Sequence, residues 1–121
     1  MQERVDRIVH QLCEALRERY DKELVRVILF GSHARGEESG ESDIDVLVVL
    51  SGDETNPFME YSNWADWVVE KLLEEQELVN LIFTSRNRFE TMHTPLYLNI
   101  RQDGITYYDR RDPVAAQPEG Y

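Results

Sequence analysis

The sequence contains a single cysteine, Cys13, so no disulfide can form within the chain. Lone thiols are typical of reducing compartments, and we therefore expect a cytoplasmic protein. No apolar run approaches the ~20 residues that a membrane-spanning helix requires. Residues 1–4 also lack the apolar stretch that begins a signal peptide. These absences favour a protein that does not contact a membrane.

Basic residues are scarce in the middle of the chain. Residues 31–60 contain eight acidic residues and one base, Arg35, and residues 61–80 contain five acidic residues and one base, Lys71. The net charge of −11 arises entirely in this stretch, because the flanking segments are balanced. Such a surface repels phosphodiester backbones and attracts metal cations or a basic partner. We therefore do not expect free nucleic acid as a ligand.

The apolar pattern predicts one domain of alternating helices and strands. Helices are expected over residues 3–20, 57–76 and 95–102, with a small helix starting at Ser32. Strands are expected over residues 25–30, 43–50, 78–83 and 105–108. This order is typical of an α/β domain of mixed α+β character, in which helices flank a short mixed sheet. We place the domain over 3–108 and expect 109–121 to be a loosely ordered tail.

One stretch combines features that suit phosphate and metal binding. It reads Gly31-Ser32-His33-Ala34-Arg35-Gly36, then five residues, then Ser42-Asp43-Ile44-Asp45. Glycine lets the backbone approach a phosphate, and the N–H groups at a helix start point towards it. Asp43 and Asp45 lie two apart on a predicted strand, so their side chains should face the same way. Paired carboxylates are suitable ligands for Mg²⁺ shared with substrate phosphates.

Each half of this pattern also has an ordinary explanation. A Gly-Ser turn after a strand is common, and an Asp-x-Asp pair is often a solvated strand edge. Arg35 can contact a phosphate or form an ion pair with Glu37 or Glu38. The combination is more demanding, because it requires the turn, Arg-Gly, a fixed spacing and paired aspartates before a buried strand.

The combined motif resembles the signature of the DNA polymerase β-type nucleotidyltransferase superfamily. The small size of the chain resembles that of the superfamily's minimal branch, the MNT domains, which are often paired with a HEPN toxin. The resemblance extends over roughly residues 3–108. It includes the leading helix, the strand before Gly31, and the segment from Thr94 to Tyr107.

The resemblance implies a function for each motif residue. Gly31, Ser32, Arg35 and Ser42 would bind the nucleotide, and Asp43 and Asp45 would bind Mg²⁺ or Mn²⁺. A third catalytic carboxylate usually lies in a Val-Asp-Leu segment on a later strand. The matching residues here are Val79-Asn80-Leu81, so Asn80 takes that position without a charge. An amide accepts no proton. Glu77 is the nearest acid but should point to the other face. The alternative is a shifted strand register, with the third acid elsewhere.

The remaining candidates have simpler interpretations. His33 occupies the variable position of the motif, where we favour exposure to solvent. His10 and His93 have no partner at zinc-ligand spacing. Cys13 should be a packing residue, and Trp64 and Trp67 are spaced as core residues.

Two hypotheses follow. The first is an enzyme that transfers a nucleoside monophosphate, with AMP from Mg·ATP as the expected donor group, to a hydroxyl group. The acceptor would be a partner protein such as a HEPN toxin, or a site completed by a homo-oligomer. The second is a catalytically impaired antitoxin or binding module that neutralises a partner by docking, which Asn80 favours. The charge and length argue against a polynucleotide polymerase or a tRNA nucleotidyltransferase.

Overall fold

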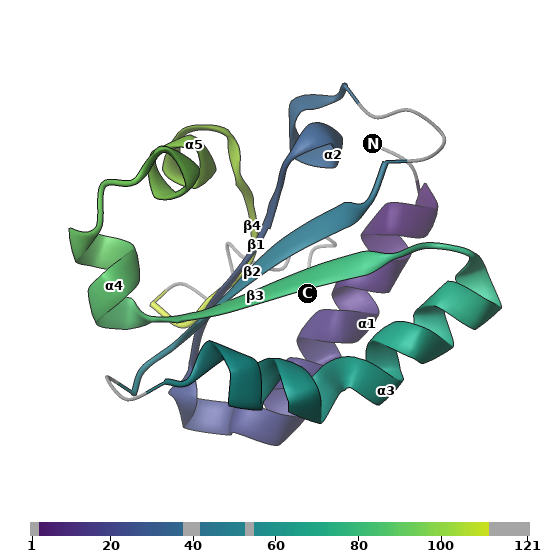
Figure 1. Ribbon diagram of the computed structural model, residues 1–121, viewed down its shortest axis with the longest axis horizontal. Helices are drawn as coiled ribbons and strands as arrows, with labels where there is room; N and C mark the ends of the chain where they lie inside the picture. Colours follow the sequence, from purple (N-terminus) through teal and green to yellow (C-terminus); the bar gives the residue numbers. More distant parts are fainter. Residues whose placement is uncertain (1–2, 38–41, 53–54, 112–121) are drawn as a thin grey trace.

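The computed structural model describes residues 3–37, 42–52 and 55–111 (Figure 1). The helices are α1 (Glu3–Tyr20), the short 3₁₀ helix η1 (Asp21–Glu23), α2 (Ser32–Arg35), α3 (Pro57–Glu75), α4 (Arg86–Thr91) and α5 (Pro95–Asp103). The strands are β1 (Leu24–Phe30), β2 (Ile44–Leu50), β3 (Val79–Ser85) and β4 (Ile105–Asp109).

The four strands form one mixed sheet in the order β3-β2-β1-β4. β1 pairs antiparallel with both β2 and β4, whereas β2 pairs parallel with β3. The parallel pair needs a long crossover, and α3 supplies it. The end of β1 therefore lies beside the beginnings of β2 and β3, at one edge of the sheet.

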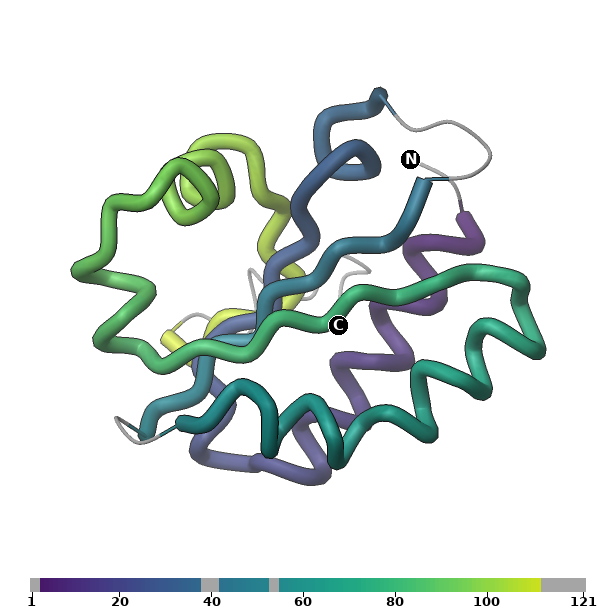
Figure 2. Tube along the Cα trace, in the orientation of Figure 1, coloured from purple at the N-terminus to yellow at the C-terminus, as the bar shows by residue number. Residues whose placement is uncertain are grey.

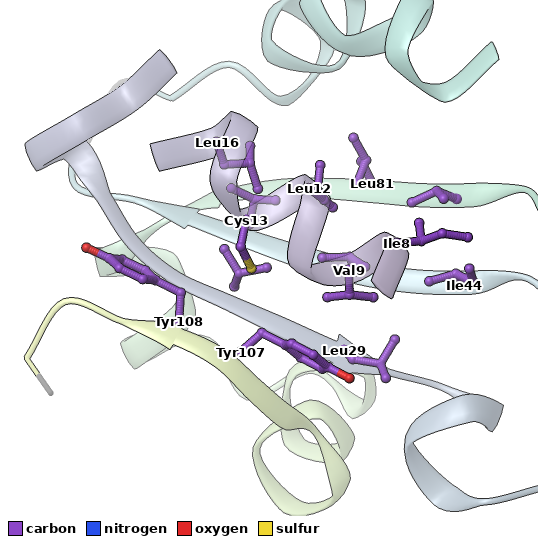
Figure 3. Close-up of a cluster of buried hydrophobic side chains, with 14 of the residues drawn as sticks. Ile8, Val9, Leu12, Cys13, Leu16, Leu29, Ile44, Leu81, Tyr107 and Tyr108 are labelled. Atoms are coloured by element: carbon purple, nitrogen blue, oxygen red, sulfur yellow. The ribbon is translucent and has the colours of Figure 1, made fainter. Parts of the chain in front are cut away.

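One face of the sheet is covered by α1 and α3 (Figures 1 and 2). The α1 side chains that recur at helical spacing are buried against inward-facing strand residues. Figure 3 shows this cluster, in which Leu12 and Leu16 of α1 lie over the strands. Its fully buried members include Val5, Ile8, Leu12, Leu16, Leu24, Val27, Leu29, Ile44, Val46 and Val48. This face holds the main hydrophobic core.

The opposite face carries α4 and α5 over a smaller core. Its buried members are Val25, Ile28, Leu47, Val49, Phe89 and Ile100. The Tyr97 hydroxyl hydrogen-bonds to Thr84 Oγ1 at 2.9 Å, which fixes α5 against β3. Because β2 is covered on both faces, its residues after Asp45 are all apolar and buried.

Polar contacts join α1 to α3 at both ends. The Tyr20 hydroxyl donates to Glu60 and accepts a hydrogen bond from Trp64 Nε1 at 3.0 Å. Burial and the Glu60 carboxylate raise the pKa of Tyr20 to about 12. At the other end, Arg7 Nη2 lies 2.7 and 2.8 Å from the two Glu75 carboxylate oxygens, and this hydrogen bond lowers the pKa of Glu75.

The predicted mixed α/β architecture is confirmed, and the first helix has the predicted bounds. Asn56 caps α3, since its Oδ1 accepts from the backbone N–H groups of Phe58 and Met59. Trp64 and Cys13 are core residues, as expected.

Other boundaries differ from the prediction. β3 begins at Val79 and ends at Ser85, and β2 begins one residue after Asp43. η1 and α4 are not predicted, because both are short and α4 buries only Phe89. Ser32 is the first residue of α2 and not its N-cap, which is Gly31.

The tail predicted for residues 109–121 lies mostly outside the described residues, which end at Arg111. Asp109 is still part of β4, where it pairs with Arg26. None of the helices in the described part of the chain combines the length and apolarity that crossing a bilayer requires.

Cys13 gives a direct test of this core. Its side chain is buried, and burial raises the pKa of the thiol to about 12. The reactive thiolate should then be only about 10⁻⁵ of the population at neutral pH. We expect the native protein to react with Ellman's reagent far more slowly than the same protein unfolded in guanidinium chloride. Rapid stoichiometric reaction of the native protein would show that α1 does not pack as described.

Candidate active site

Three strand ends bring the motif residues together. In the antiparallel pair, Phe30 of β1 lies opposite Asp45 of β2. In the parallel pair, Asp45 lies opposite Asn80 of β3. Gly31 follows Phe30 directly, so Gly31, Asp45 and Asn80 are neighbours across the sheet although they are far apart in the sequence.

The side chains of Asp43, Asp45 and Asn80 converge. The Asn80 amide nitrogen donates to Asp43 Oδ2 at 3.1 Å and to Asp45 Oδ1 at 3.0 Å. One amide group therefore bridges two carboxylates that would otherwise repel each other. The predicted orientation is confirmed, because both aspartates face the same group. The register that places Asn80 opposite Asp45 is also confirmed.

These side chains lie on the α4–α5 face of the sheet. Residues of one strand alternate between faces, and Leu47 and Val49 belong to the small core under α4 and α5. Asp45 shares their parity and lies just beyond that core. Asp43 is exposed and Asp45 is half-buried. A ligand can thus reach the carboxylates from solvent, while the buried part of β2 holds them in place.

Gly31 makes room for Asp45. A Cβ atom at Gly31 would lie 2.3 Å from Asp45 Oδ2, and the backbone φ of +79° is one that side-chain-bearing residues rarely adopt. Any other residue would strain the turn and displace the carboxylate. The glycine therefore lets the turn after β1 approach the acidic pair closely, so that the backbone of the turn lies beside the carboxylates.

Ser32 and Arg35 lie on the turn that follows. Ser32 starts α2, in which the N–H groups of Ala34 and Arg35 donate to the Gly31 carbonyl at 3.1 and 3.2 Å. The first two N–H groups of a helix have no acceptor within it. The Arg35 side chain forms an ion pair with Glu37, with Nε–Oε1 at 3.1 Å. Both partners are exposed, so the pair stabilises little and the guanidinium can reorient.

His33 is buried, and the expectation of solvent exposure is wrong. Its side chain is 3% exposed, and Nε2 donates to the backbone carbonyl of Ser42 at 3.0 Å. This contact fastens α2 to the residue that precedes Asp43. Sequence patterns do not predict this contact, because residues 33 and 42 are separated by a polar segment without apolar periodicity.

The described residues place no third carboxylate beside the acidic pair. No group of three or more His, Cys, Asp or Glu side chains that could hold a metal occurs within residues 3–37, 42–52 and 55–111. Glu77, the nearest alternative in sequence, is buried and lies 4.0 Å from Arg4 of α1. It therefore faces the α1 side, as its position predicts.

A cavity of about 180 Å³ opens beside Gly31, between the turn and α5. Its walls combine apolar side chains with polar groups at the rim. They are Phe30, Gly31, Arg35, Leu96, Asn99, Ile100 and Asp103. This recess adjoins the Gly31 turn, whereas Asp43, Asp45 and Asn80 are not among its walls.

Comparison with known proteins agrees with this geometry. Residues 9–105 match the family model described as a nucleotidyltransferase domain. A relative from Methanocaldococcus jannaschii, provisionally named a protein adenylyltransferase, is 29% identical over 104 residues, which cover 85% of this chain and 97% of the relative.

Solved structures share the fold. A provisionally identified nucleotidyltransferase from Sulfolobus solfataricus superimposes with a TM-score of 0.67 at 22% identity, covering 91% of this chain and 85% of that one. A complex of the tri-AMPylated HEPN toxin of Shewanella oneidensis with its MNT antitoxin contains a chain with a TM-score of 0.56 at 17% identity, covering 89% and 75%.

The family match spans most of the chain, including the Gly-Ser turn, the aspartate pair and Asn80. It agrees with the resemblance noted from the motif and with the mixed sheet that brings these residues together. The chain therefore belongs to the nucleotidyltransferase domain family.

Proposed function

We propose that this chain transfers AMP from a complex of ATP with Mg²⁺ or Mn²⁺ to a hydroxyl group on a partner protein. The observation that carries the proposal is the contact of one Asn80 amide with both Asp43 and Asp45, beside a glycine turn. The relative named as a protein adenylyltransferase and the AMPylated toxin in a related complex support the choice of AMP and of a protein acceptor.

Asp43 and Asp45 would hold the metal ion. Their oxygens lie close enough to share one amide donor, and hard oxygen ligands suit Mg²⁺. Mg²⁺ is usually bound by one or two carboxylates together with substrate phosphates and water, so a third carboxylate is not needed for binding. When bound, such an ion stabilises negative charge on the attacking and leaving oxygens.

The turn after β1 would bind the triphosphate. Gly31 presents backbone without a side chain, and the Ser32 hydroxyl and first-turn N–H groups are hydrogen-bond donors. Arg35 would exchange its exposed partner Glu37 for a phosphate, since a guanidinium matches phosphate geometry. The hydroxyl of Ser42 would add a further contact, on the segment that His33 fastens to α2.

In the reaction, the acceptor oxygen forms a bond to the α-phosphorus of ATP. The bond from that phosphorus to the bridging oxygen breaks, and pyrophosphate leaves. The hydroxyl proton passes to Asp43, Asp45 or water, because the Asn80 amide accepts no proton. The residues of this chain thus position both reactants, but they supply one carboxylate fewer than the family pattern.

Asn80 has opposite effects on binding and on turnover. As a neutral bridge it relieves repulsion between the two carboxylates before metal binds. As a replacement for a carboxylate it removes a base, and losing a positioned general base typically slows a reaction by ~10²–10⁴. We therefore expect nucleotide binding without impairment and slow transfer.

The test of this proposal is Asn80→Asp. This substitution restores the charge with little change in shape, so transfer of radiolabelled AMP from ATP to the purified partner should become faster by about tenfold or more. Asn87→Asp, on the exposed surface of α4, adds the same charge away from the site and should change nothing.

Two results would contradict the proposal. Equal transfer rates for the wild type and Asn80→Asp would mean that the base is another residue. Absence of transfer in both variants, with the nucleotide bound, would favour the second candidate function.

That second candidate is an antitoxin that neutralises its partner by docking alone. Asn80 favours it, and so does the outer surface of α3, where large apolar side chains lie exposed beside Asp66, Glu70 and Glu74. Val69 is 51% exposed, Leu72 is 44% exposed and Leu73 is 76% exposed. Apolar side chains among carboxylates suit a protein partner with a basic, partly apolar surface.

Leu78, which follows α3 in the chain, lies close to the candidate active site, because its backbone carbonyl accepts a hydrogen bond from the Ile44 N–H at 2.9 Å. Leu78 is 38% exposed and precedes Asn80 by two residues. A partner that covers Leu73 and Leu78 would therefore present its own side chains near Asp43 and Asp45. We propose that a HEPN-type toxin occupies this surface in both candidate functions.

Leu73→Lys tests this docking. The change should weaken association with the partner by at least about tenfold, because an exposed apolar anchor is replaced by a charge. Leu98→Lys is the matched control, since Leu98 is 47% exposed on α5, on the other face of the sheet. Equal affinities of the two variants, measured by calorimetry, would exclude the α3 surface as the docking site.

A further inference from the structure

A second cavity lies at the opposite end of the same face of the sheet. It has a volume of about 310 Å³. Its walls are Val25, Arg26, Val49, Arg86, Phe89, Glu90, Arg110 and Arg111. From Arg26 to Gly31 the chain advances five strand positions, or about 17 Å. The cavity is therefore separate from the candidate active site.

Four guanidinium groups line this cavity in a chain that is strongly acidic overall. The chain has 13 basic and 24 acidic residues. Cations in such a chain would ordinarily be surrounded by carboxylates. Among residues 3–37, 42–52 and 55–111, the carboxylates that line the cavity or pair with its arginines are Glu90, in the wall, and Asp109, which pairs with Arg26 and Arg111. The cavity-lining side chains described in the structure therefore carry an excess of positive charge.

Two of the arginines have no carboxylate partner. Arg86 makes no hydrogen bond or ion pair with any described residue, although it is half-buried. Arg110 donates to the backbone carbonyl of Lys22 and forms no ion pair within the described ranges. Both guanidinium groups therefore keep donors available for a ligand.

The other two arginines are paired with Asp109, and of these Arg26 is the less exposed, at 23% against 68% for Arg111. Arg26 Nε lies 3.4 Å from Asp109 Oδ2, and its guanidinium stacks on the Phe89 ring at 5.5 Å from the centroid. The Arg111 side chain makes two hydrogen bonds to Asp109, at 3.3 and 3.2 Å. The cavity is thus partly organised before any ligand binds, which lowers the entropy cost of binding.

The cavity floor is apolar. Val49 is fully buried, and Val25 and Phe89 are 4% exposed. Arg26 and Arg101 both lie over the Phe89 ring, so the aromatic faces are covered by cations. A ligand would therefore meet Arg86 and Arg110 with its charged group, above apolar side chains that are already almost fully buried.

We propose that this cavity binds a small molecule through a phosphate group. Guanidinium groups pair with phosphate oxygens through two parallel hydrogen bonds, and a phosphate dianion matches the excess of two positive charges. The volume lies near the lower limit of small-molecule sites, ~300 Å³. Both inorganic phosphate or pyrophosphate and a phosphomonoester such as AMP offer this chemistry. The proposal does not depend on the proposed function.

The experiment uses the full chain labelled with ¹⁵N, without divalent metal and at constant ionic strength. Inorganic phosphate, pyrophosphate and AMP are titrated separately, and the arginine Nε–H and backbone signals are followed by NMR. We expect saturable shifts at Arg86, Arg110 and Phe89. The tightest of the three ligands identifies the source of the phosphate: AMP if the apolar floor contributes, and an inorganic anion if it does not.

Arg86→Gln should weaken this binding by about tenfold or more, because a charge-assisted hydrogen bond is lost. Arg88→Gln is the matched control: it lies on the same helix, is exposed and does not line the cavity. It should leave the affinity unchanged.

Three results would overturn the proposal. NMR signal shifts that never saturate would show that the added anions screen the protein's charges weakly and do not bind in the cavity. An equal loss of affinity in the Arg88→Gln control would show a general effect of charge. Shifts confined to Gly31 and Ser32 would place the phosphate in the candidate active site.

Discussion

The register of β2 against its two neighbours is the constraint on which the site depends. Asp45 lies opposite Phe30 on one side and opposite Asn80 on the other. A slip of one residue in either pairing would turn a functional side chain to the α1–α3 face. The apolar run after Asp45 prevents such a slip, because it would expose core residues on one face or the other. The packing of the main core therefore determines where the polar side chains of the candidate active site lie.

Two local contacts refine this arrangement. Gly31 leaves room for the Asp45 carboxylate, because a Cβ atom at position 31 would lie 2.3 Å from Asp45 Oδ2. His33 holds α2 to the Ser42 backbone through its hydrogen bond to the Ser42 carbonyl. Both contacts set how closely the turn approaches the acidic pair. The repulsion within that pair is relieved by the neutral Asn80 amide, which donates a hydrogen bond to each carboxylate. Binding of a cation would replace this neutral bridge with a stronger attraction.

The sequence predicts the long elements because α1 and the strands have strong periodicity, and it predicts the convergence of Asp43 and Asp45 because alternate strand residues share a face. It does not predict α4, where only Phe89 is buried, or the burial of His33, which depends on a contact across a loop. The sequence does not predict the arginine cavity either. Arg26, Arg86 and Arg110 are brought together only by the pairing of β1 with β4 and by the position of α4.

The central claim is that Asp43 and Asp45 hold a divalent metal ion together with a nucleoside triphosphate. Paramagnetic Mn²⁺, added with a non-hydrolysable ATP analogue to ¹⁵N-labelled protein, tests it most directly. The account predicts strong broadening of the Asn80 side-chain amide and the Ser32 backbone signal, which Asp43→Asn combined with Asp45→Asn abolishes. Broadening that persists in this double variant, or that appears only at other residues, would contradict the account.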